Sequence, residues 1–191
     1  MMSQEFLEKL KKINKSFFTL KDLEKIWPGK KDTLKVVLSR MVKKGKLKRV
    51  KRNFYILPEK TLEIEKIANQ IYFPSYLSFE TALSKWGILS QIPYFLTFAT
   101  FLKTKKFQIE KTLIEYRKIK KELFFGFRLY KGVFIAQPEK ALADTIYLAS
   151  LGKLKINFNE LDLSKIDKKK FFKLIKKFPL KTQKFASQLK F

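Results

Sequence analysis

Apolar residues between positions 30 and 44 recur at the spacing of an amphipathic helix. Leu34, Val37, Leu38, Met41 and Val42 stand at i, i+3, i+4, i+7 and i+8, which places them on one stripe that a core can bury. The opposite face and its flanks carry the remaining residues, which are Thr33, Lys35, Val36, Ser39, Arg40 and Lys43. The pattern therefore predicts a helix with one buried face and one face open to a partner.

A basic hairpin is predicted directly after this helix. Gly45 can adopt the left-handed conformation that ends a helix. Two short strand-like runs follow, 47–50 and 54–57, and three polar residues at 51–53 separate them. A helix followed at once by such a hairpin is typical of the recognition helix and wing of a winged helix-turn-helix, so we predict that this region binds DNA.

Two further helices are predicted before position 30. Residues 3–14 place their apolar residues on one face, and a second helix spans 20–27. Thr19 and Asp22 have the spacing of a capping box at the start of the second helix. A turn at 28–29 follows, and Asp32 is the predicted N-cap of the third helix.

The rest of the chain predicts an α+β domain. Helices are expected over 62–71, 79–86 and 138–150, whereas 94–136 is rich in alternating, β-forming runs. We therefore expect a small antiparallel sheet flanked by helices. The predicted domains are 1–59, a winged helix-turn-helix; 60–152, the α+β domain; and 153–191, a basic helical tail.

The distribution of charge along the chain predicts an anionic partner. The net charge of +26 is uneven, with 18 basic and 6 acidic residues in 1–60, 13 and 8 in 61–150, and 12 and 3 in 151–191. A lysine-rich genome alone would spread the charge evenly. Seven of the ten residues from 43 to 52 are Lys or Arg, and such a cluster neutralises phosphates, which favours nucleic acid.

The basic tail is open to three interpretations. A helical face of Phe and Leu residues near 171–178 alternates with lysines, so the tail can dock on its own domain with the lysines solvated. It can instead extend a DNA contact, or lie on an anionic membrane surface. We rank these interpretations in that order.

The composition excludes several kinds of site. The chain has no Cys and no His, which removes disulfides, thiolate metal sites and the Ser–His or Cys–His pairs of hydrolases. Six isolated glycines give no phosphate-binding loop, so no cofactor and no metal are predicted.

No apolar run reaches the length of a membrane helix, and the first residues do not read as a signal peptide, so we expect a cytoplasmic protein without a membrane partner.

The DNA-contacting residues follow from their places on the predicted helix and hairpin. Base-reading candidates are Thr33, Lys35, Val36, Ser39 and Arg40; Arg40 suits guanine, and Val36 suits a thymine methyl. Phosphate-binding and wing candidates are Lys31, Lys43, Lys44, Lys46, Lys48, Arg49, Lys51 and Arg52, and Arg52 at the hairpin tip is the candidate for a minor groove.

Five polar residues of the middle region allow an enzymatic alternative. Ser78, Glu80, Glu139, Lys140 and Asp144 include the carboxylates and lysine of a metal-dependent nuclease. The structural interpretation is simpler and is the one we favour. It makes Ser78 a helix cap, places the glutamates in first turns, and pairs Lys140 with Asp144 on an exposed helix face.

Four stretches in this order resemble the AbiEi-type antitoxins of type IV toxin–antitoxin systems. The stretches are RVKRNFYIL (49–57), PSYLSFETALSKWGILSQIP (74–93), ELFFGFRL (122–129) and IAQPEKALADTIYL (135–148). The resemblance covers about residues 5–150.

The resemblance implies a repressor of its own operon, bound to promoter DNA through an N-terminal winged helix. It also implies a C-terminal domain that counters a nucleotidyltransferase-like toxin, and no enzyme activity. Self-association on DNA is a further expectation, because a winged helix this small gains specificity when two copies bind a repeat. A metal-dependent nuclease with a winged-helix targeting domain, and a winged-helix adaptor that binds protein, remain the alternatives.

Overall fold

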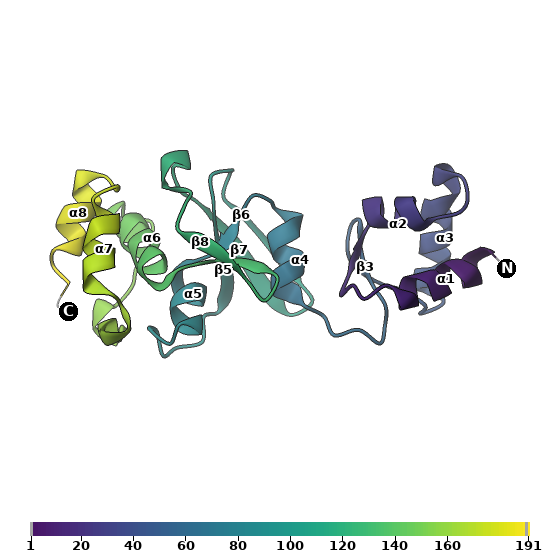
Figure 1. Cartoon of the computed structure of the whole chain (residues 1–191), viewed down its shortest axis with the longest axis horizontal. Coiled ribbons are helices and arrows are strands. Elements are labelled where there is room, and N and C mark those ends of the chain that lie inside the picture. The colour runs from purple at the N-terminus through teal and green to yellow at the C-terminus, as the bar shows by residue number, and fades with distance from the viewer. Residues whose placement is uncertain (1, 190) are drawn as a thin grey trace. The chain divides into compact units, whose positions relative to one another are not determined.

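A computed structural model describes residues 2–189 and 191 of the chain. The fold divides into two compact units, Met1–Ile67 and Ala68–Phe191, which Figure 1 colours from purple to yellow along the chain. Among the described residues, no helix combines the length and the apolar character needed to cross a membrane.

The first unit consists of three helices and a small antiparallel sheet (Figure 1). Its elements are α1 (Met2–Lys12), β1 (Phe18–Thr19), α2 (Leu20–Ile26), α3 (Lys31–Lys43), β2 (Lys48–Lys51) and β3 (Phe54–Ile56). The strand order is β1-β3-β2, so β1, from before α2, lies on the far side of β3 from β2. The three helices and the hairpin are those predicted from the apolar pattern, whereas β1 was not predicted.

Apolar side chains of all three helices meet in one core. Phe6 and Leu10 of α1, Leu23 of α2, and Leu34 and Leu38 of α3 are fully buried there. Trp27 closes the end of this core, with its ring edge-on to that of Phe6 at 5.0 Å between centroids. The core therefore fixes which face of α3 is turned inward.

The start of α2 is held by the predicted capping box, whereas α3 starts in a different way from that predicted. The Asp22 backbone N–H donates to the Thr19 hydroxyl, and the Asp22 carboxylate accepts from the Thr19 N–H at 2.8 Å. The prediction that Asp32 caps α3 is wrong, because the helix begins two residues earlier than such a cap requires, at Lys31, and Lys30 occupies the N-cap position. The carbonyl of Lys30 accepts bonds from the Thr33 hydroxyl and the Trp27 indole, which fix the turn there.

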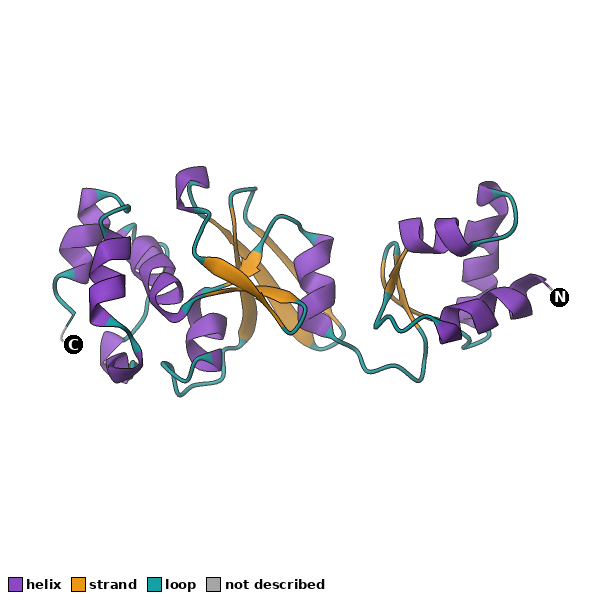
Figure 2. Cartoon of the chain, in the orientation of Figure 1, coloured by secondary structure: helices purple, strands orange, loops and turns teal. Residues whose placement is uncertain are grey.

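The second unit is built on a six-stranded sheet with helices on both faces (Figure 2). Its strands are β4 (Tyr76–Leu77), β5 (Phe95–Thr100), β6 (Lys105–Ile109), β7 (Thr112–Lys118), β8 (Phe127–Tyr130) and β9 (Val133–Ala136). Its helices are α4 (Ile64–Ile71, within which the two units divide), α5 (Phe79–Lys85), η1 (Lys121–Leu123), α6 (Pro138–Ser150), η2 (Phe158–Glu160), η3 (Leu163–Lys165), α7 (Lys168–Ile175) and α8 (Leu180–Ala186).

The prediction of an antiparallel sheet is wrong, since the sheet is mixed. Its order is β6-β7-β5-β4-β9-β8, and the pairs β5–β7 and β4–β9 run parallel. Both parallel pairs join strands that are not consecutive in the chain, and β4 has only two residues. Alternation along the sequence shows which residues form strands but carries no information about such non-local pairing.

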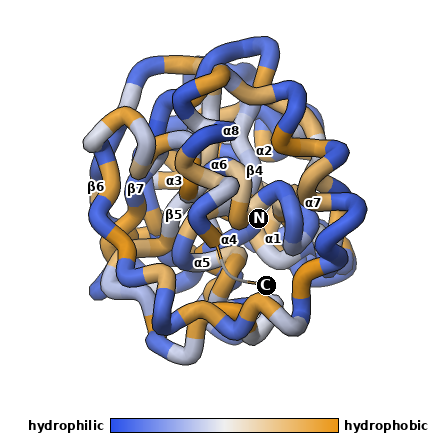
Figure 3. The backbone as a smooth tube through the Cα atoms, turned by 90° about the vertical axis from the view of Figure 1, so that its left-hand side faces the viewer, coloured by the Kyte–Doolittle hydropathy of each residue, from blue (hydrophilic) through white to orange (hydrophobic). Residues whose placement is uncertain are grey.

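The C-terminal helices dock on their own unit, as the first-ranked interpretation of the tail predicts. In α7 and the turn after it, Phe171, Ile175 and Phe178 are buried, whereas the lysines between them are exposed. Figures 1 and 2 show α7 and α8 beside α6. In Figure 3 the colour of the tube changes between blue and orange at short intervals along these helices, as amphipathic elements require.

Candidate nucleic-acid interface

The face of α3 turned away from the core is open, as predicted. Leu34, Leu38 and Met41 are buried, whereas Ser39 and Arg40 are exposed. Val36 is 51% exposed, so this apolar side chain stands in solvent at the middle of the open face. The orientation of the helix therefore leaves the predicted partner-facing residues accessible.

Residues 48–56 form the predicted two paired strands. Lys48 pairs with Ile56, Arg49 with Tyr55 and Lys51 with Phe54, with an irregularity in the ladder between Arg49 and Lys51. Asn53 turns the chain with a φ of 68°, a left-handed conformation that Asn tolerates better than most residues. Its carbonyl accepts a bond from the Leu20 N–H at 2.9 Å, which ties the hairpin tip to the start of α2.

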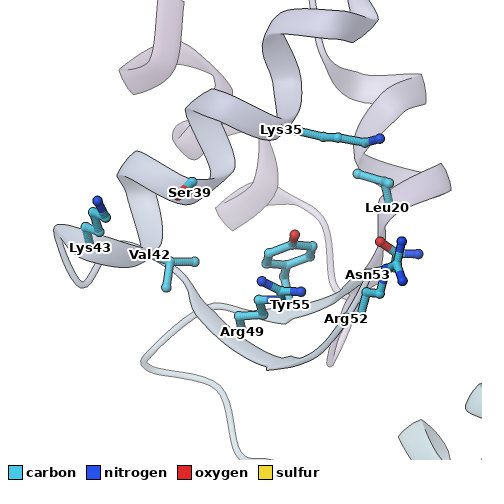
Figure 4. Close-up of a pocket in the computed structure, with 9 residues that line it drawn as sticks. All are labelled: Leu20, Lys35, Ser39, Val42, Lys43, Arg49, Arg52, Asn53 and Tyr55. Atoms are coloured by element: carbon cyan, nitrogen blue, oxygen red, sulfur yellow. The ribbon is translucent and has the colours of Figure 1, made fainter.

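A groove of about 430 Å³ separates α3 from this hairpin (Figure 4). One wall is formed by α3 and the other by the hairpin, with Leu20 at one end. The lining residues are Leu20, Lys35, Ser39, Val42, Lys43, Arg49, Arg52, Asn53 and Tyr55. Lys35 and Lys43 stand on the helix wall, while Arg49 and Arg52 stand on the hairpin wall.

The groove is strongly electropositive, because its four cations are not neutralised by the protein. Within residues 2–189 and 191, no carboxylate forms an ion pair with Lys35, Lys43, Arg49 or Arg52. All four side chains are exposed. Two cations on each wall of a concave surface focus a positive potential inside it, which attracts a phosphate chain.

The other predicted cations surround the groove in different ways. Lys31 is exposed at the first residue of α3, Lys48 is exposed on β2, and Lys51 is half-buried beside the hairpin turn. Arg40, Lys44 and Lys46 lie on the other flank of α3. There, with Ser3, Val37 and Met41, they line a smaller depression of about 180 Å³. The base-reading candidates are thus divided, with Lys35 and Ser39 in the groove and Arg40 on the opposite flank.

Thr33 has a bonded hydroxyl. Its Oγ1 donates to the Lys30 carbonyl at 2.7 Å and accepts from the Trp27 indole N–H at 3.3 Å. These bonds fix the turn before α3, so this hydroxyl has a structural task that the sequence pattern did not indicate.

Tyr55 and Asn53 belong to the groove although the sequence reasoning did not single them out. The Tyr55 side chain is only 8% exposed, yet in Figure 4 its hydroxyl points toward α3. No described residue forms a hydrogen bond with this hydroxyl. The alternation of side chains along 54–57 could have indicated that Tyr55 faces opposite to Phe54.

The five polar residues of the middle region are placed quite differently from the prediction. Lys140 and Asp144 form an ion pair, but both side chains are fully buried, so the predicted exposed pair is wrong. Ser78 stands at the N-cap of α5, but its hydroxyl makes no cap bond and donates instead to Asp144 at 2.8 Å. The hydroxyl of Tyr76 also donates to Asp144, at 2.8 Å, and accepts from Lys140 at 2.9 Å.

Burial dominates the electrostatics of this network. It lowers the pKa of Lys140, against the attraction of Asp144, and raises the pKa of Asp144, against the bonds that the carboxylate accepts. Burial, and then the charge of Asp144, raise the pKa of Tyr76 well above its ordinary value. The Lys140 ammonium also lies 5.1 Å from the ring centre of Phe125 and 5.2 Å from that of Phe178.

The two glutamates occupy the predicted first turns and are also bonded to other parts of the unit. Glu80 receives both of its bonds from Nη1 of Arg117, at 2.7 and 2.9 Å. Glu139 accepts from the backbone N–H of Asp167, the N-cap of α7, at 3.3 Å. Together with the bonds of Lys140 and Asp144, these bonds connect α5, α6, β7 and α7.

The first unit is thus a three-helix domain whose third helix and following hairpin enclose a basic groove. Residues 5–58 match the family model described as "Transcriptional regulator, AbiEi antitoxin", which confirms the resemblance drawn from the sequence over this segment. The segment is therefore similar to antitoxins that regulate transcription. A search of curated proteins finds no match to the chain.

Proposed function

We propose that the N-terminal region is a winged helix-turn-helix domain that binds double-stranded DNA, with α3 as its recognition helix and β2–β3 as its wing. The observation that carries the proposal is the groove between them, with two unneutralised cations on each wall. The regulator family matched by residues 5–58 supports it independently. A recognition helix enters the major groove while the wing contacts the adjoining backbone.

In this proposal, one DNA backbone strand runs along the groove between α3 and the wing. Lys35 and Lys43 reach its phosphates from one side, and Arg49 and Arg52 reach them from the other. The inward-pointing hydroxyl of Tyr55 donates to the same strand. Lys31, Lys44, Lys46, Lys48 and Lys51 add contacts to neighbouring phosphates on both flanks.

The bases are read by the part of α3 that projects beyond the groove. Val36 at the centre of the open face suits a thymine methyl, and Arg40 on the far flank suits the two acceptors of guanine. Ser39, between the groove and the open face, is placed to contact either a base edge or a phosphate. The bonded hydroxyl of Thr33 makes it the weakest of the predicted readers.

The biological role that follows is an autoregulating antitoxin. Bound at its own promoter in the cytoplasm, the protein would exclude RNA polymerase sterically, and self-association on a repeat would raise specificity. The match over residues 5–58 supports the regulator and antitoxin class. The assignment to a type IV system and the expectation of a nucleotidyltransferase-like toxin depend on the resemblance of residues 74–148. The second unit is proposed as the part that counters this toxin.

The substitution Arg40→Ala tests base reading. We expect it to reduce the preference for the promoter duplex over a scrambled duplex by about tenfold, since a bidentate Arg–guanine contact is worth roughly 1–3 kcal/mol of discrimination. Fluorescence-anisotropy titrations with both duplexes measure this preference. As the control, Lys46→Ala on the same flank should weaken binding to both duplexes equally, and an equal loss with Arg40→Ala would refute the assignment.

The nuclease alternative loses support from the bonding of its candidate residues. Asp144 is fully buried, Glu80 is held by Arg117, and Glu139 binds the backbone of Asp167. These carboxylates are engaged in holding the second unit together.

A DNA-binding titration separates the proposal from the other alternative, a protein-binding adaptor. The adaptor would show negligible DNA affinity at every salt concentration.

A further inference from the structure

A second basic cleft, of about 440 Å³, lies in the second unit. Four segments meet there: the residue before β6, the end of β7 with the link that follows it, the last turns of α6, and the residues just after α6. The lining residues are Thr104, Glu115, Arg117, Lys118, Ile119, Lys120, Tyr147, Leu148 and Lys153. A volume of this size is in the range of small-molecule sites, which span roughly 300–1,000 Å³.

Two acidic groups at this cleft are compensated, whereas Glu122, whose charge also acts on Tyr147, has no ion pair among the described residues. Arg117 binds Glu115 through Nε at 2.8 Å and Glu80 through Nη1 at 2.7 Å, and Lys106 binds Glu115 at 2.9 Å. Burial raises the pKa of Glu115, but Lys106 and Arg117 outweigh it and bring the pKa below its ordinary value. These two acids and two bases therefore leave no net charge on the cleft.

The remaining charge is positive and comes from three lysines. Lys118, Lys120 and Lys153 are exposed, and none of them pairs with a carboxylate among residues 2–189 and 191. The last carbonyls of α6 would repel an anion most strongly if they were unbonded, but the chain itself donates hydrogen bonds to two of them. The N–H of Gly152 caps Ala149 O at 2.8 Å, and the N–H of Lys153 caps Leu148 O at 2.9 Å.

Tyr147 supplies a hydrogen-bond donor at this cleft. Its side chain is only 4% exposed, and no described residue accepts or donates a hydrogen bond at its hydroxyl. Every buried side-chain nitrogen or oxygen among the described residues has a partner, so the unbonded hydroxyl of Tyr147 is accessible to solvent, and the residue lines the cleft. Burial, with the charges of Glu122 and Asp144, raises the pKa of Tyr147, which keeps the hydroxyl protonated as a donor.

We propose that this cleft binds a small polyphosphate anion, free or as part of a nucleoside triphosphate. The three lysines take the phosphate oxygens as point charges, the Tyr147 hydroxyl donates to one of them, and Ile119 and Leu148 provide an apolar floor. The proposal concerns the second unit alone and does not depend on DNA binding by the first.

The test is isothermal titration calorimetry of the full chain at fixed ionic strength, with tripolyphosphate and with ATP as probes. We expect saturable binding that weakens about tenfold or more when Lys118, Lys120 and Lys153 are all replaced by Gln, because charge-assisted bonds are the strong ones. Tyr147→Phe keeps the ring and removes only the hydroxyl, so it should weaken binding several-fold without altering the thermal melt. Tighter binding of ATP than of tripolyphosphate would identify a nucleotide as the ligand.

The control replaces Lys169, Lys173 and Lys176 of the α7 region by Gln, which removes the same charge from an exposed surface. It should leave polyphosphate binding unchanged. An equal loss in the control and cleft variants, or the absence of saturable binding to the full chain, would overturn the proposal. It would also be overturned if the cleft variant lost duplex DNA affinity while it bound tripolyphosphate as tightly as the control variant does.

Discussion

Replacing Asp144 by Ala should destabilise the second unit by about 3–5 kcal/mol, the range found when one member of a buried ion pair is removed. The carboxylate is fully buried, and it accepts bonds from Lys140, Tyr76 and Ser78. Its loss leaves an ammonium without a counter-charge in the interior, and leaves the two hydroxyls without an acceptor. Since whole domains are stable by only about 5–15 kcal/mol, this is the largest effect expected of any single substitution here.

The measurement is urea denaturation followed by tryptophan fluorescence. Trp86 is in the second unit and donates to the Ala136 carbonyl at 2.8 Å, whereas Trp27 belongs to the first unit. A Trp27→Phe background therefore assigns the signal to the second unit. The transition midpoint should fall sharply in the Asp144→Ala variant.

A compensating variant separates loss of the counter-charge from loss of packing. Replacing Lys140 by Met together with Asp144 by Leu removes both charges and keeps most of the volume, so a large part of the stability should return. Lys170→Ala, which removes an exposed partner of Asp167 in the same unit, should change the midpoint very little. If Asp144→Ala were as mild as Lys170→Ala, the buried pair would not be holding this unit together.

Neutralising the groove should produce the second large effect. Replacing Lys43, Arg49 and Arg52 by Gln should weaken binding to any duplex by about a hundredfold at 0.15 M salt, because each lost phosphate contact also loses the release of its counterion. The slope of log K against log salt should become shallower by roughly 3. These three cations stand on both walls of the groove and are not paired by described residues.

Anisotropy titrations at four or five salt concentrations measure both quantities. The control is again the replacement of Lys169, Lys173 and Lys176 by Gln, which removes an equal charge far from the groove in sequence. It should leave the slope nearly unchanged. Equal changes in slope for the two variants would mean that net charge, rather than the groove, determines DNA affinity.

The first unit could be predicted in detail because its determinants are local. The period of Leu34, Leu38 and Met41 fixes the buried face of α3, and the turn residues at 45 and 53 fix its end and the hairpin. The start of α3 escaped prediction, because a side chain outside the helix, Trp27, takes part in the turn before it. Tyr55 was missed because its role depends on the wall that faces it across the groove.

The second unit shows why a pattern of charges in a helix cannot be interpreted without its neighbours. Lys140 and Asp144 are four residues apart, as in many solvated helical pairs. Their burial comes from Phe125 in the loop before β8 and Phe178 in the turn after α7, which no local pattern links to α6. The parallel pairing of β4 with β9 and of β5 with β7 is equally non-local.

The proposal that α3 and the hairpin form the DNA-binding surface is tested most directly by amide chemical-shift mapping of the ¹⁵N-labelled full chain. The titrant is a duplex from the region upstream of its own gene. We predict that the perturbed amides lie within residues 31–46 and 48–53. Perturbations confined to residues 68–191, or no perturbation at all, would contradict the proposal.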